Sequence, residues 1–144
     1  MRLAPITEPS PQARRLSAMG SVAAMSGGAQ QEPAELSVVL AWLDGGPAPD
    51  RSVQRAAVKE SLAALAALAP GHSVEVRVPP FGAIQCVSGP RHGRGTPPNV
   101  VEADPRTWLG LATGRVSWDD ALRTGRLSAS GTRTGEVRVL LPLM

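Results

Sequence analysis

The sequence has few cysteine and aromatic residues, and each shortage disfavours a class of protein. Cys86 is the only cysteine in 144 residues, so no internal disulfide can form, and a reducing, cytoplasmic location is expected. Aromatic residues make up 3% of the chain, and lysine and arginine form no long run. Because a nucleic-acid surface needs stacking rings and clustered cations, no nucleic-acid partner is expected.

Long apolar runs and metal-binding clusters are missing as well. The longest apolar run, Leu62 to Pro70, is too short to span a membrane, so no integral membrane segment is expected. Two histidines, one cysteine and no motif with metal-ligand spacing argue against a metal site. The glycines near Gly89 do not lie between a strand and a helix, so no nucleotide fingerprint is present and no cofactor is expected.

The remaining composition is that of a globular protein, with 42% apolar and 19% charged residues. Residues 1–32 hold prolines and paired glycines without an apolar period, which predicts a disordered leader. Met19 and Met25 leave open a gene start further along the chain. Residues 33–144 are predicted to form one domain.

Helices are predicted first in this domain, and strands follow them. Apolar residues at helical spacing predict one helix before Gly45 and a second from the N-cap residue Asp50 to Pro70. Alternation of apolar and polar residues then predicts strands over residues 73–78, 83–87 and 99–102.

Two short helices and two further strands are predicted next. Asp104 and Ser117 are good N-cap residues, and Trp108 and Trp118 begin the apolar stripes of the helices that follow them. Alternating residues predict strands over 127–130 and 136–141, joined by a hairpin turn. The fold class is therefore α+β, with a mostly antiparallel five-stranded sheet covered on one face by helices.

The stretch WLGLATGRVSWDDALRTGRLSASG, residues 108–131, resembles the sterol carrier protein superfamily. In that family a short helix ends in a small-Thr-Gly-Lys/Arg turn, a second helix ends in Gly-Lys/Arg, and a Leu-x-x-x-Gly strand follows. Residues 112–115, 121–126 and 127–131 match these features in order and spacing. Residues 78–105 look like a stand-alone actinobacterial branch, the bacterial sterol carrier orthologues.

The junction VEADP, residues 101–105, is also similar to the C-terminal domain of mycothiol-dependent maleylpyruvate isomerase-like proteins. The metal-binding helical domain of those enzymes and its histidines do not occur here, so the resemblance does not imply their activity. An accessory domain that acts with a thiol-cofactor-dependent enzyme stays open as an alternative.

The sterol carrier resemblance implies a non-enzymatic protein that binds or carries a sterol-like or fatty acyl lipid in an apolar cavity between sheet and helices. A dry apolar wall suits such a ligand, because its chain gains mainly from leaving water. The positions expected to line the cavity are Ile84, Val100, Trp108, Leu111, Trp118, Leu122, Leu127, Val137 and Val139. The alternative is that these side chains fill the core, and that the domain serves as a protein-interaction module.

Polar candidates are few. Arg91, His92 and Arg94 either contact an anionic head group at the mouth of the cavity or form a solvated turn. Cys86 lies within a predicted strand and is expected to be buried and inert, so no catalytic residue is assigned.

The end of the sequence departs from the family pattern, because relatives often continue into a C-terminal helix that closes the tunnel. This chain instead reads LLPLM at residues 140–144. Either the cavity is open there, or this segment or a partner chain covers it. An uncovered apolar mouth favours self-association or a protein partner.

Overall fold

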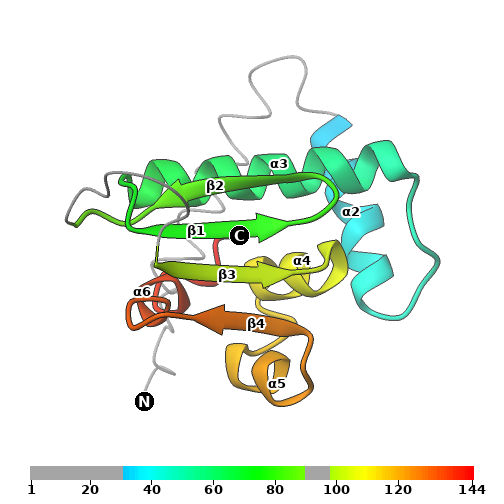
Figure 1. The fold of residues 1–144 in the computed structure, drawn as a ribbon. Helices are drawn as coiled ribbons and strands as arrows, with labels where there is room; N and C mark the ends of the chain where they lie inside the picture. Colours follow the sequence, from blue (N-terminus) through cyan, green and yellow to red (C-terminus); the bar gives the residue numbers. More distant parts are fainter. Residues whose placement is uncertain (1–30, 90–97) are drawn as a thin grey trace, which may run out of the picture.

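The structure is a computed structural model that describes residues 31–89 and 98–144. Helices and a single sheet form two layers, as predicted for an α+β protein (Figure 1). In chain order the elements are α2 (Gln31–Leu43), α3 (Arg51–Leu68), β1 (Val74–Val78), β2 (Gly82–Cys86), β3 (Asn99–Ala103), α4 (Pro105–Thr113), α5 (Trp118–Arg123), β4 (Leu127–Ser130) and α6 (Gly135–Arg138).

Over residues 31–89 and 98–144 the sheet has four strands in the order β2-β1-β3-β4, and not the five that were predicted. β1 pairs antiparallel with β2, β1 pairs parallel with β3, and β3 pairs antiparallel with β4. The sheet is therefore mixed, with two antiparallel pairs and one parallel pair at its centre. The central parallel pair arises because the chain leaves β2 at one edge and returns beyond β1 to form β3 (Figure 1).

The fifth strand predicted over 136–141 is absent from the described residues, and α6 lies there instead. Gly131, with φ of 99°, turns the chain back against the start of β3. The Asn99 Oδ1 atom then accepts a hydrogen bond from the Arg133 backbone N–H at 3.0 Å. This contact holds the chain after β4 in a tight turn, so it does not continue into a hairpin partner.

Capping residues set the limits of the two tryptophan-bearing helices, as predicted. The Asp104 carboxylate accepts a hydrogen bond from the Thr107 N–H at 3.1 Å, and Gly114 ends α4 with φ of 82°. The Ser117 hydroxyl accepts a hydrogen bond from the Asp120 N–H at 3.1 Å and begins α5. These caps produce a sharp corner between α4 and α5.

One face of the sheet packs against the helices and forms the core (Figure 1). Every second residue of β1 is fully buried, and the residues between them are half-buried. The Glu75–Arg77 ion pair lies among these alternate residues, on the opposite face of the sheet. The core consists of Val39, Val58, Leu62, Leu65, Val74, Val76, Val78, Phe81, Cys86, Val87, Val101, Ala103, Trp108, Leu109, Leu111, Ala112, Trp118, Ala121, Leu127 and Val137.

Residues 140–144, called the tail below, lie against the C-terminal end of α4. The backbone N–H groups of Leu143 and Met144 both donate to the Ala112 carbonyl, at 2.8 and 3.1 Å. Leu140, Leu141 and Leu143 are half-buried and pack against the core. The tail therefore packs against the end of α4 and against the core.

Candidate functional site

Trp108 lies in the region where the sequence predicts a lipid site. The side chain is 0% exposed, and its indole N–H donates to the Ser61 hydroxyl of α3 at 2.8 Å. That hydroxyl donates in turn to the Val58 carbonyl at 2.8 Å. The polar atom of the indole is thus satisfied inside the protein, and Trp108 fixes α4 against α3.

Six of the nine predicted lining residues come together in or against the core, namely Ile84, Trp108, Leu111, Trp118, Leu127 and Val137. They come from both edges of the sheet and from α4, α5 and α6. Their side chains give an aliphatic and indole surface on the helix side of the sheet.

The other three predicted lining residues lie elsewhere. Val100 is half-buried and alternates with the buried Val101, which places it on the opposite face of the sheet. Leu122 and Val139 are 40% and 78% exposed. Val139 was expected to face inward because residues 136–141 were predicted to form a strand. The chain forms α6 there instead, and the Val139 side chain is exposed.

Several residues that form the same apolar surface were not predicted as lining. Val76 pairs with Ile84 on one side and with Val101 on the other, so these three form a row across the sheet. Leu109 and Leu62 are also buried beside Trp108 in the core. The alternating valines of β1 were a sequence signal that could have identified Val76 as a core residue. No local signal identified Leu109, because its inward position depends on how α4 packs against the rest of the core.

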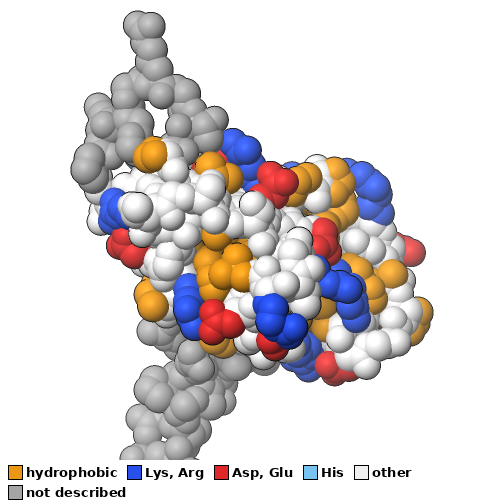
Figure 2. Space-filling view, turned by 60° about the horizontal axis from the view of Figure 1, so that its bottom comes forward, with side chains coloured by type: hydrophobic (Ala, Val, Ile, Leu, Met, Phe, Trp, Pro, Cys, Tyr) orange, Lys and Arg blue, Asp and Glu red, His pale blue; other side chains and the backbone are white. Residues whose placement is uncertain are grey.

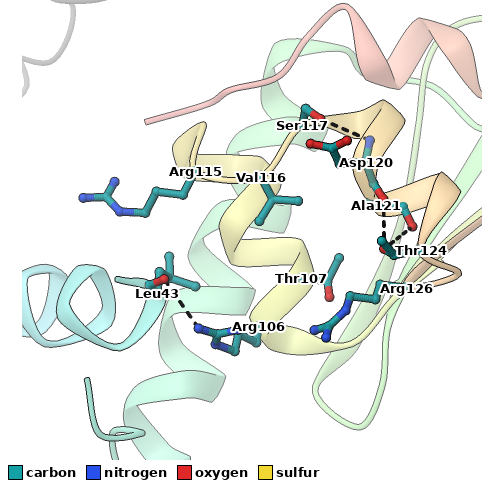
Figure 3. Close-up of a pocket in the computed structure, with 10 residues that line it drawn as sticks. All are labelled: Leu43, Arg106, Thr107, Arg115, Val116, Ser117, Asp120, Ala121, Thr124 and Arg126. Atoms are coloured by element: carbon teal, nitrogen blue, oxygen red, sulfur yellow. Dashed lines mark hydrogen bonds between the residues drawn. The ribbon is translucent and has the colours of Figure 1, made fainter. Parts of the chain in front are cut away.

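A surface groove of about 330 Å³ lies beside α4 and α5, outside the core (Figure 3). None of the nine predicted lining residues lines it. Four charged side chains line it, which distinguishes it from the aliphatic core. The lining residues are Leu43, Arg106, Thr107, Arg115, Val116, Ser117, Asp120, Ala121, Thr124 and Arg126.

The predicted head-group residues Arg91, His92 and Arg94 lie outside the described residues. Cys86 is 0% exposed, which confirms the predicted burial of this side chain, and burial raises the pKa of its thiol to about 11. His72 is exposed, with Nδ1 2.9 Å from Gln85 Oε1.

Neither a metal centre nor a membrane helix is found within residues 31–89 and 98–144. These residues contain no group of three His, Cys, Asp or Glu side chains placed to hold a metal ion. No helix among them has the length and apolar character needed to cross a bilayer.

The fold and its core together define a small α+β domain in which short helices enclose aliphatic side chains against a mixed sheet. The family model described as "Bacterial SCP ortholog" matches residues 50–143, so the chain belongs to this bacterial branch of the sterol carrier proteins. No curated protein matches the chain. The relation to maleylpyruvate isomerase-like proteins stays a prediction.

Proposed function

We propose that this protein binds a sterol-like or fatty acyl lipid between the sheet and the helices and carries it without catalysing a reaction. The match to the sterol carrier family over residues 50–143 carries this proposal, because it spans the whole sheet and every core helix except α2. The aliphatic core is compatible with such a ligand, since most of its residues are valine, leucine and alanine.

The ligand chain would lie against the core side chains Leu111 of α4, Trp118 of α5 and Leu127 of β4. Each CH₂ group of an acyl chain gains ~0.8 kcal/mol on leaving water. A flexible chain needs no polar partner along its length, and among the described residues the core offers no buried ionised side chain to oppose it.

The tail is the segment that a ligand chain would displace in this proposal. It is attached by two hydrogen bonds to a single carbonyl, that of Ala112, and by three half-buried leucines. The strands of the sheet are held by continuous ladders of backbone hydrogen bonds, so the tail is expected to detach at a lower free-energy cost than a strand. An acyl chain would replace the leucine side chains against the same apolar wall.

Native mass spectrometry of gently purified protein, together with titration of a fluorescent fatty acid, tests the proposal. We expect a bound lipid mass that disappears after denaturation, and saturable binding of the probe. Trp118→Ala is expected to weaken binding by at least about fivefold, because this side chain is 9% exposed and forms part of the wall. Leu122→Ala, on the same helix but 40% exposed, is the matched control.

The tail provides a second variant for the same assay. Replacing Leu141 and Leu143 together by alanine weakens the attachment of the tail and is expected to tighten fatty acid binding. Val139→Ala serves as control, because its side chain is 78% exposed. Several preparations without lipid, combined with no saturable binding of the probe, would contradict the proposal.

A filled core with a protein-interaction function is the second candidate, and the exposed apolar residues favour it. Leu122 and Val139 are exposed on α5 and beside α6, and the ion pair between Asp119 and Arg138 at 2.7 Å joins these two helices. Figure 2 brings this side forward and shows hydrophobic side chains at the surface among charged ones. Concentration-dependent association that Leu122→Asp abolishes, in protein that binds no fatty acid, would support this candidate.

A further inference from the structure

The surface groove beside α4 and α5 carries an excess of positive charge that the proposed lipid site does not use. Four charged side chains line it, the three arginines Arg106, Arg115 and Arg126 and the single acid Asp120. Its volume of about 330 Å³ is at the lower end of the range for small-ligand sites.

Arg106 stands at the start of α4 and is half-buried. One of its terminal nitrogens, Nη2, lies 3.3 Å from the Trp42 carbonyl and 3.5 Å from the Leu43 carbonyl at the end of α2. Both distances are long for hydrogen bonds. Within residues 31–89 and 98–144 no carboxylate pairs with Arg106, so its full positive charge meets only the partial negative charge of these carbonyls at the end of α2.

Arg126 follows α5 and points across the groove toward Arg106 (Figure 3). Within the part of the chain that the structure describes, neither guanidinium has an ion pair with a carboxylate. Both arginines line the same groove, so an anion bound there would lie near two positive charges that lack a carboxylate partner among the described residues.

The other charged residues of the groove are engaged elsewhere. Arg115 points away from Arg126 in Figure 3 and pairs with Asp44, with Nε to Oδ1 at 2.9 Å. The Asp120 carboxylate lies at the Ser117 end of the groove and accepts from Arg123 at 3.1 Å. Arg123 and the Ser117 hydroxyl lower the pKa of Asp120, so it stays ionised but does not face Arg126.

We propose that Arg106 and Arg126 bind a phosphate group in this groove. A guanidinium presents its N–H donors in a planar fork, which matches two oxygens of an oxyanion. A tetrahedral phosphate, whose oxygens point in several directions, can accept from two such forks more readily than a planar carboxylate can. The walls between them, Val116, Ala121 and the buried Thr107, carry no charge that would repel the anion.

Titration of the isotope-labelled protein with inorganic phosphate, followed by backbone amide NMR in a phosphate-free buffer, tests this site. Saturable shifts are expected at Thr107, Val116 and Arg126. Arg126→Gln is expected to weaken binding at least about tenfold, since it removes one of two charged forks. Arg55→Gln removes the same charge from an exposed position on α3 outside the groove and should change affinity less than about twofold.

Hexyl phosphate, titrated in the same way, distinguishes a lipid head group from free phosphate. If hexyl phosphate binds more tightly than inorganic phosphate and still depends on Arg126, the natural ligand is a phospholipid head group. If the two probes bind with equal affinity, the natural ligand is free phosphate. The phosphate proposal is overturned if wild type shows no saturable shifts or if Arg126→Gln binds like wild type. A phosphate-free fatty acid probe reports on the core separately, so failure of this site and failure of lipid binding are distinguishable.

Discussion

The buried hydrogen bond between Trp108 and Ser61 gives a prediction whose size follows from the structure. Both side chains are 0% exposed, so Ser61→Ala leaves the indole N–H without an acceptor and without water. An orphaned buried donor costs about 1–3 kcal/mol. The greater helix propensity of alanine in α3 offsets about 0.5 kcal/mol of this loss. We therefore expect Ser61→Ala to lower the free energy of unfolding by about 0.5–2.5 kcal/mol.

A double-mutant cycle separates this hydrogen bond from general packing effects. Trp108→Phe removes the donor, so Ser61→Ala made in that background orphans no group and should cost less than about 0.5 kcal/mol. Urea unfolding monitored by circular dichroism measures all four proteins without depending on tryptophan fluorescence. If Ser61→Ala costs the same in both backgrounds, the bond does not fix α4 against α3, and the account of the core is refuted.

Two further predictions concern a turn and a thiol. Gly131→Ala should lower the unfolding free energy by more than about 1 kcal/mol, because φ of this residue is 99° and an added Cβ atom would overlap the side-chain oxygen of Asn99. Gly135→Ala serves as control in the same urea assay, because a Cβ atom at Gly135 would meet open space. The Cys86 pKa is raised to about 11 from 9.0, so the folded state holds its proton longer than the unfolded state as pH rises. Stability from this group is complete below pH 9 and falls between pH 9 and 11. Unfolding at several pH values should show that decline in wild type and a smaller one in Cys86→Ala; an identical decline in both would contradict it.

Local signals in the sequence predicted much of the fold. The caps at Asp104 and Ser117 and the stop at Gly114 depend on neighbouring residues alone, so α4 and α5 were expected where they lie. The alternating valines of β1 likewise predicted a strand with one buried face.

Features decided by distant contacts were not predictable in this way. Alternation at 136–141 is typical of a strand, but the Asn99 side chain from β3 binds the Arg133 backbone and redirects the chain. Val100 and Val101 are adjacent valines, and only pairing of Val101 with Val76 and Ala129 determines which one points inward.

No signal in the sequence predicted the surface groove beside α4 and α5 either. Arg106 and Arg126 are twenty positions apart, and no motif links them. The α4–α5 corner, itself predictable from its caps, brings them to one groove (Figure 3). The direction of each guanidinium depends on the packed positions of α2, α4 and α5, which local patterns do not contain.

The most direct test of lipid binding is a titration of methyl-labelled protein with hexadecanoate, followed by NMR. Our account predicts saturable shifts of the core methyl groups of Leu111, Leu127 and Val137, with intermolecular contacts to the acyl chain, and little change at the exposed Leu122 and Val139. Unchanged core methyl groups in the presence of excess ligand, or shifts confined to Leu122 and Val139, would contradict it.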